Sequence, residues 1–208
     1  VIIQCYAEKL LCKGVDLSAV GATTGSLYGI YARKGNLCID LEDCTVVLEN
    51  SSPTSAIVCA VRTMDPASKT RVIGCAIKVR AENETVFGVH YYGTMRLADS
   101  SVEVTGQTGE NVIGLNDASG IETCITGSVL HVTAGAGIGY GMWSPMGGNC
   151  EIHGSEVTVT TADKDAYGLY SPAGGNFRIS GSRLSTRSAS VGDAKTMWCG
   201  TATVCIED

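Results

Sequence analysis

The amino-acid sequence predicts an all-β parallel β-helix: a solenoid of seven to eight coils, about 27 residues per coil, with little or no helix. Three observations predict this fold. A unit recurs along the whole chain, apolar and polar residues alternate inside each unit, and the 208 residues include 26 glycines but only 4 prolines. We expect a single domain over residues 1–208. It should be a fragment of a longer chain, since it opens on a strand-like apolar run.

The recurrence is clearest near the C-terminus. Tyr140-Gly141-Met142-Trp143-Ser144-Pro145 returns 27 residues later as Tyr167-Gly168-Leu169-Tyr170-Ser171-Pro172. Residues 148–155 return as residues 175–182 at the same spacing. Because self-similarity at a fixed period marks repeat architectures, these matches predict stacked, equivalent units.

A second signature places glycine or aspartate before a small residue and a pair of alternating apolar residues. Gly and Asp tolerate the left-handed backbone of a tight turn, so this position should be a turn. The turn positions are Gly14, Asp43, Gly74, Asp99, Gly127, Gly154, Gly181 and Asp208, at spacings of 29, 31, 25, 28, 27, 27 and 27. The small residues after them are Cys44, Cys75, Ser100, Ser128, Ser155 and Ser182.

Other repeat folds fit less well. No segment has a sustained helical period, the pattern of a leucine-rich repeat is absent, and a β-propeller blade would need about 40–45 residues. A unit of about 27 residues with three short strands suits one coil of a wide β-helix, whose successive coils stack about 4.8 Å apart.

On these repeats the chain resembles the right-handed parallel β-helix superfamily that includes pectate lyases. More closely, it resembles repeat proteins of gut bacteria with a recurring "YGIYA…GNLxI" unit, here Tyr28-Gly29-Ile30-Tyr31-Ala32 followed by Gly35-Asn36-Leu37. The resemblance covers nearly the whole chain and is specific for fold. It implies an extracellular or cell-surface location, and it is nearly silent on activity.

The composition limits the classes of partner and cofactor that we expect the chain to bind. The net charge is −6 and no Lys/Arg cluster exists, so we expect no nucleic-acid partner. No apolar run approaches the ~18 residues that span a bilayer, so we expect no membrane insertion. Most of the ten cysteines fall at core-facing positions and should be free, buried thiols. The sequence contains no C-x-x-C pair of the kind that binds zinc. We expect no metal and no cofactor.

The search for catalytic residues finds none. There is no G-x-S-x-G, and His90, His131 and His153 fall in different columns of the repeat, as surface strand residues would. A lyase or hydrolase would need acids that converge. The candidates are Asp40, Glu42 and Asp163, which we do not expect to meet, because the column of Glu42 reads Lys13, Glu42, Ile73, Ala98, Thr126, His153, Ser180 and Glu207.

One column is a candidate ligand site. Alternation places Ile30, Ile57, Val89, Leu115, Met142, Leu169 and Met197 in the core. The opposite, outward column then holds Tyr31, Val58, His90, Asn116, Trp143, Tyr170 and Trp198. Trp143, Tyr170 and Trp198 should form an aromatic stripe on three consecutive coils. We expect bare backbone at Gly141 and Gly168 beside it, which would leave room for a ligand chain.

Three interpretations of the stripe stay open. It could stack on sugar rings, contact a protein partner, or serve as a cross-strand ladder that stabilises the sheet. The sequence therefore favours a non-catalytic surface or secreted module that binds carbohydrate or protein. The alternatives are a polysaccharide lyase or hydrolase, argued from fold analogy, and an architectural rod that oligomerises through its ends or its aromatic face.

Overall fold

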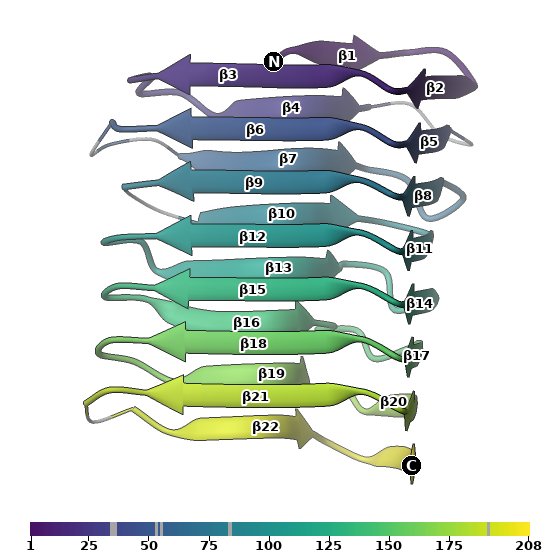
Figure 1. The fold of residues 1–208 in the computed structure, drawn as a ribbon, viewed down its shortest axis with the longest axis vertical. Helices are drawn as coiled ribbons and strands as arrows, with labels where there is room; N and C mark the ends of the chain where they lie inside the picture. Colours follow the sequence, from purple (N-terminus) through teal and green to yellow (C-terminus); the bar gives the residue numbers. More distant parts are fainter. Residues whose placement is uncertain (34–36, 53, 55, 83–84, 191) are drawn as a thin grey trace.

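A computed structural model of the chain is a parallel β-solenoid of about seven turns (Figure 1). It describes residues 1–33, 37–52, 54, 56–82, 85–190 and 192–208, and no helix occurs among them. Each turn contributes one strand to each of three parallel sheets, as the sequence predicts. Gly35 and Asn36 of the recurring unit lie outside the described residues.

The strands are short, and each sheet holds every third strand of the chain. Sheet A contains β1 (Ile3–Cys5), β4 (Leu27–Ala32), β7 (Ile57–Thr63), β10 (Thr85–Tyr91), β13 (Asn111–Asp117), β16 (Ile138–Trp143), β19 (Ala166–Ser171) and β22 (Ala194–Cys199). Sheet B contains β2 (Lys9–Lys13), β5 (Cys38–Glu42), β8 (Lys69–Ile73), β11 (Thr94–Ala98), β14 (Glu122–Thr126), β17 (Asn149–His153), β20 (Gly175–Ser180) and β23 (Ala202–Glu207). Sheet C contains β3 (Asp16–Gly21), β6 (Thr45–Asn50), β9 (Ala76–Ala81), β12 (Ser101–Gly106), β15 (Val129–Ala134), β18 (Glu156–Thr161) and β21 (Arg183–Ser188).

The predicted turn column is confirmed by backbone geometry. Seven of its eight positions have a positive φ between 48° and 64°: Gly14, Asp43, Gly74, Asp99, Gly127, Gly154 and Gly181. They lie between the strands of sheet B and sheet C in every turn. Only Gly, Asp and Asn adopt this left-handed conformation at low cost, which explains why the column uses Gly and Asp.

The small residue after each turn forms a ladder of side-chain hydrogen bonds, which we call the turn ladder: Cys44, Cys75, Ser100, Ser128, Ser155 and Ser182. Each backbone N–H in the ladder donates to the side-chain oxygen or sulfur of the next member, at 3.0–3.3 Å. Each serine hydroxyl in turn donates to a backbone carbonyl two residues earlier, as Ser128 does to Thr126 at 2.8 Å. The side chain therefore satisfies backbone groups at a buried corner.

The core fills the space enclosed by the three sheets and is almost wholly apolar. Its sheet A column is Ile30, Val61, Val89, Leu115, Met142, Leu169 and Met197. Val61 takes the place that the sequence assigned to Ile57, so that assignment was wrong. All ten cysteines are free, and Cys5, Cys12, Cys44, Cys59, Cys75 and Cys150 are buried, as expected.

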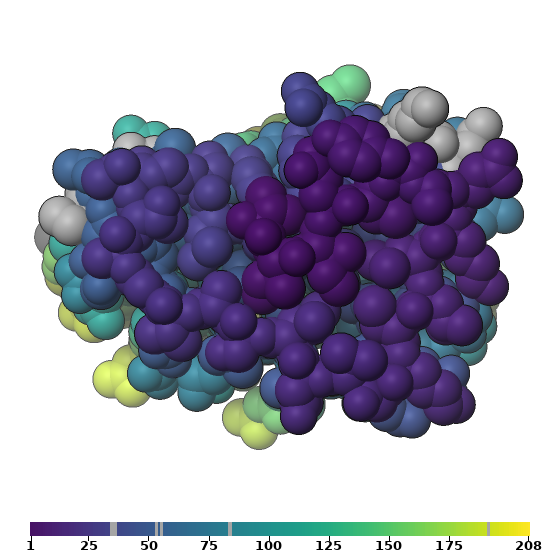
Figure 2. Space-filling view, turned by 90° about the horizontal axis from the view of Figure 1, so that it is seen from above, coloured from purple at the N-terminus to yellow at the C-terminus, as the bar shows by residue number. Residues whose placement is uncertain are grey.

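Apolar side chains are exposed on the first and last turns. Figure 2, a view onto the N-terminal end, shows residues of the first turn spread over much of that end. Val20 there is 70% exposed, and Ile206 in β23 is 72% exposed. Both belong to strands that have a parallel neighbour on one side only.

Strands of sheet A break the usual alternation at a column of small residues. A β-carbon at Gly141 would lie 2.4 Å from Val157 across the core and 2.5 Å from the carbonyl oxygen of Gly168. The same inward crowding occurs at Gly88 and Gly114. The glycine and the apolar residue after it, such as Met142, therefore both face the core.

We predict that Gly141→Ala lowers the free energy of unfolding by about 1–3 kcal/mol, because the added methyl group meets backbone that is itself bonded in a ladder. Urea denaturation measures the loss. Gly21→Ala is the matched control: no atom lies within 4 Å of its added β-carbon, and the change should stay within about 0.5 kcal/mol. Equal effects of the two substitutions would contradict this account.

A polar network interrupts the core near the corner between sheets A and B. The Asp117 carboxylate accepts hydrogen bonds from the backbone N–H groups of Gly120 (2.8 Å) and Ser119 (3.2 Å) and from the Thr123 hydroxyl (3.3 Å). The Thr123 hydroxyl also meets the phenol of Tyr91 at 2.5 Å. Burial raises the pKa of Asp117 despite these donors.

Because the pKa of Asp117 is higher in the folded state, the protonated carboxyl favours folding. This contribution is fully present below the ordinary aspartate pKa of about 3.9 and is lost as pH rises through the raised folded value. We predict that the stability of the wild type relative to Asp117→Asn falls over this interval. Urea denaturation of both proteins across acidic pH measures the difference, and a pH-independent difference would contradict the prediction.

Candidate functional site: the outer face of sheet A

The strand register brings the predicted ligand column together. Tyr31, His90, Asn116, Trp143, Tyr170 and Trp198 all lie in one column on the outer face of sheet A, which we call the outer column. Its second position is Arg62, paired with Tyr31 and His90, and not Val58 as the sequence suggested. Val58 is buried in the core and pairs with Leu27, so its predicted place was wrong.

Exposure varies along the outer column. Trp198 is 38% exposed, and Tyr31, His90, Trp143 and Tyr170 are half-buried. Asn116 is only 5% exposed. Trp198, on the last turn, is therefore the most exposed member of the outer column.

A second column lies beside the outer column, where the sequence led us to expect bare glycine backbone. It contains Tyr28, Cys59, Phe87, Ile113, Tyr140 and Tyr167, which form an apolar cluster separate from the core. The expectation was wrong because Gly141 and Gly168 face inward. Side chains three positions apart, such as Tyr140 and Trp143, then become neighbours on the outer face, with ring centroids 5.3 Å apart.

The rings of the two columns stack on one another. Tyr140 is nearly parallel to Trp143 (17°) and to Tyr167 (12°), and Tyr170 is nearly parallel to Trp198 (14°, centroids 4.8 Å apart). Parallel rings at these distances overlap in part, so part of the aromatic surface serves as a cross-strand ladder. Trp143 and Trp198 each have a single ring partner, so one indole face of each is free of ring contacts within the described chain.

Charged groups border the aromatic cluster where strands β19 and β22 begin. Asp165 accepts hydrogen bonds from the Tyr167 phenol (2.9 Å) and the backbone N–H of Asp193 (2.8 Å), which together lower the pKa of Asp165. Lys195 pairs with the Asp193 carboxylate at 2.8 Å. Burial, followed by the bond to Asp165, raises the pKa of Tyr167, and burial raises the pKa of Tyr140 to about 12. Both phenols therefore stay protonated at neutral pH.

The N-terminal half of the face carries the guanidinium group of Arg62. The Arg62 guanidinium lies 5.3 Å from the ring centroid of Tyr28 and 5.8 Å from that of Tyr31, and it donates to the Tyr28 hydroxyl at 2.6 Å. On the next turns, the His90 ring nitrogen Nδ1 and the Asn116 amide nitrogen are 3.0 Å apart. Burial, with a smaller contribution from Arg62, lowers the pKa of His90 to about 4, so its ring is neutral at pH 7.

Several buried polar atoms of the outer column have no hydrogen-bond partner in the described residues. They are Arg62 Nε, His90 Nε2, Asn116 Oδ1 and Trp143 Nε1, on four consecutive turns. Ser68 and Thr70 supply the other two such atoms in the described chain. Buried polar atoms are normally paired, so their concentration in one column distinguishes this face from the other two.

The acids considered for polysaccharide cleavage do not form a site. Asp40 pairs with Arg71 at 2.9 Å, Glu42 pairs with Lys13 at 2.7 Å, and Asp163 lies in the turn between β18 and β19. No group of three or more potential metal ligands occurs among the described residues. The same residues include no helix long and apolar enough to cross a membrane.

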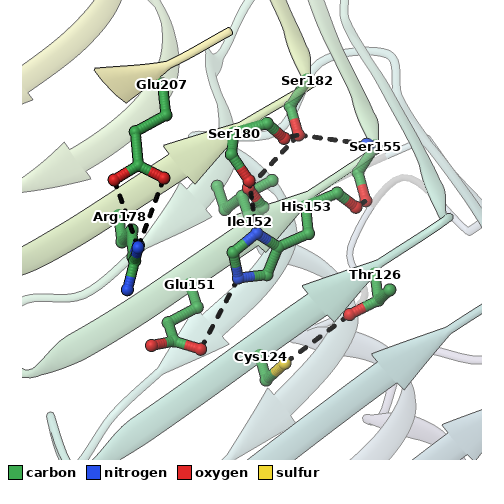
Figure 3. Close-up of polar contacts among 10 residues, drawn as sticks. All are labelled: Cys124, Thr126, Glu151, Ile152, His153, Ser155, Arg178, Ser180, Ser182 and Glu207. Atoms are coloured by element: carbon green, nitrogen blue, oxygen red, sulfur yellow. Dashed lines mark hydrogen bonds and ion pairs between the residues drawn. The ribbon is translucent and has the colours of Figure 1, made fainter. Parts of the chain in front are cut away.

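Sequence reasoning passed over a polar array on the outer face of sheet B. Its strands carry Glu151 and His153 on β17, Arg178 and Ser180 on β20, and Glu207 on β23 (Figure 3). The predicted column of Glu42 is confirmed from Lys13 to Glu207, so His153, Ser180 and Glu207 were already aligned in the sequence. The signal for the array is a column of unlike polar residues, which stacking of acids alone does not reveal.

Comparison with known proteins finds no matching family model, curated protein or solved structure.

We predict that Arg62→Gln raises the pKa of His90 from about 4, because it removes a neighbouring positive charge. The value should stay below the ordinary histidine pKa of about 6.5, since burial is the larger cause. An NMR titration of the His90 ring protons measures both values, with His131 as an internal reference. An unchanged or lowered pKa would show that Arg62 does not act on His90.

Proposed function

We propose that the outer face of sheet A is a non-catalytic binding surface that holds a carbohydrate chain, with Trp143, Tyr170 and Trp198 as its main contacts. The observation that carries the proposal is the pair of indoles, on turns two apart, that each keep one face free of ring contacts. The apolar face of a sugar ring can lie on such an indole.

The spacing of these side chains suits an extended ligand. Trp143, Tyr170 and Trp198 lie on consecutive turns, so the two indoles are about 10 Å apart at the usual strand spacing. A single sugar cannot cover both positions at once, whereas an oligosaccharide running along the solenoid can. The proposed ligand is therefore a polysaccharide.

The surroundings supply polar contacts beside the rings. Asp165, Asp193 and Lys195 border the cluster and provide carboxylate and ammonium groups for sugar hydroxyls. The internal pairing of these groups orders them before any ligand arrives, which reduces the entropy lost on binding. The remaining members, Tyr31, His90 and Asn116, extend the same column toward the N-terminus and would contact a longer chain.

The family that the sequence resembles suggests where such a binding surface would act. A right-handed, pectate-lyase-like coil from a gut bacterium, acting outside the cell or at its surface, would meet polysaccharides in quantity.

Titration with soluble polysaccharides tests the proposal, using a neutral β-glucan, a xylan, a mannan and polygalacturonate. We predict that at least one ligand changes the tryptophan fluorescence and binds in calorimetry. Trp143→Ala and Trp198→Ala should each weaken binding about tenfold or more, equivalent to about 1.4 kcal/mol.

Met146→Ala is the matched control, because Met146 is 67% exposed beside the same face but outside both columns. It should leave affinity unchanged. If none of the four polysaccharides binds, or if the double variant of Trp143 and Trp198 binds as tightly as the wild type, the carbohydrate proposal is wrong. The aromatic face would then be a ladder or a protein contact.

A further inference from the structure

The outer face of sheet B brings a serine, a histidine and a glutamate together on two neighbouring strands. His153 on β17 is in register with Ser180 on β20, and Glu151 precedes His153 by two residues on the same face. Figure 3 shows the imidazole between the Ser180 hydroxyl and the Glu151 carboxylate. The parallel register fixes the positions of all three α-carbons, because each strand is bonded to neighbours on both sides.

The contacts follow the order of a nucleophile, a base and an orienting acid. The Ser180 Oγ lies 2.5 Å from His153 Nδ1, and the Glu151 Oε2 lies 3.6 Å from His153 Nε2. A carboxylate beside Nε2 favours the ring proton on that nitrogen, which leaves Nδ1 to accept the serine proton. Among the histidines of the chain, His153 is the one whose ring nitrogen meets a serine hydroxyl in the described structure.

A cationic donor and an open hollow lie beside this group. Arg178 is in register with Glu151, and its Nη2 is 3.2 Å and 3.3 Å from the two carboxylate oxygens of Glu207. Its Nε and Nη1 have no partner in the described residues and remain free to donate. A surface hollow of about 490 Å³ adjoins the group on the side of Glu151 and Arg178, which line it together with Asn149 and Asn176, while Ser180 and His153 lie outside its lining. The side chain of His153 is 35% exposed, so a small substrate can reach it.

We propose that Ser180 is a nucleophile activated by His153, with Glu151 as a positioning residue, and that this site hydrolyses exposed carboxylic esters, such as acyl groups on an alcohol or a sugar. Arg178 would stabilise the oxyanion of the tetrahedral intermediate through its free N–H groups. The site lies on a different sheet from the aromatic columns, so the proposal does not depend on carbohydrate binding there.

The chemistry balances with water as the only co-reactant. The Ser180 oxygen forms a bond to the ester carbonyl carbon while its proton passes to His153 Nδ1. The carbon–oxygen bond to the alcohol breaks, and His153 returns the proton to the departing oxygen. Water then attacks the acyl-serine, giving a proton to His153, and the carboxylic acid leaves as Ser180 regains its hydrogen.

Labelling with a fluorophosphonate probe tests the proposal, because such probes phosphonylate activated serines. We expect mass spectrometry of the wild type to place the label on Ser180, and hydrolysis of p-nitrophenyl acetate to show a burst of about one product per chain. Ser180→Ala should abolish both signals. His153→Gln should slow labelling at least tenfold while the melting temperature stays unchanged.

Three further variants separate chemistry from folding. Ser185→Ala, on the outer face of sheet C without a histidine partner in the described chain, should label like the wild type. Glu151→Gln should slow labelling, and Glu151→Asp should restore part of the rate, which a structural role alone would not predict. A wild type unlabelled at Ser180, or a His153→Gln variant labelled at the wild-type rate, would overturn the proposal.

Discussion

The structure depends on one constraint: each coil must present its strands to the next coil in register, so that backbone hydrogen bonds close between them. Because strands are parallel and successive, every strand inside a sheet is bonded on both sides, and equivalent residues lie one above the other. The left-handed turn residue and the turn ladder hold the corner between sheets B and C at the same height in each coil. The core, both columns of sheet A and the array on sheet B all inherit their positions from this stacking.

Much of this arrangement could be predicted from the sequence because its physical causes are local. A positive φ restricts the residue type, so Gly or Asp at a steady spacing marks the turn. Period-two alternation marks which side chains of sheet C face the core, as Val157 and Val159 do. Five of the six residues proposed as a ligand column, from His90 to Trp198, share one column because the repeat length sets the register from Val89 onward. Tyr31 joins the same column through its pairing with Arg62.

The errors also have physical causes. One unit is 31 residues long, so counting forward by 27 residues from Ile30 and Tyr31 assigned Ile57 and Val58 where the structure has Val61 and Arg62. Strict alternation also fails in sheet A, where Gly141 and Met142 both face the core. That inward glycine results from close packing against Val157 in another sheet, and no local sequence rule contains this information. The second aromatic column was missed for the same reason.

The outer faces of sheets A and B differ in how their side chains interact with one another. On sheet A, aromatic rings stack on one another, and four buried polar atoms of the outer column have no hydrogen-bond partner among the residues that the structure describes. On sheet B, unlike charges and hydroxyls on adjacent strands pair with one another, as Arg178 does with Glu207. The repeat therefore builds an aromatic surface and a polar surface from one backbone pattern, with side chains that vary freely only where they point away from the core.

The turn ladder has a consequence for how such a chain can change its length. Each rung of that ladder reaches only the coil before or after it, through the backbone N–H of one member and, at Ser100 and Ser182, also through the side-chain hydroxyl. Duplication or loss of one whole unit would leave every remaining junction chemically equivalent to an existing one, whereas loss of a few residues would misalign all three sheets at once. Evolution of this protein should therefore proceed in complete coils, with smaller insertions confined to the loops that leave the solenoid surface.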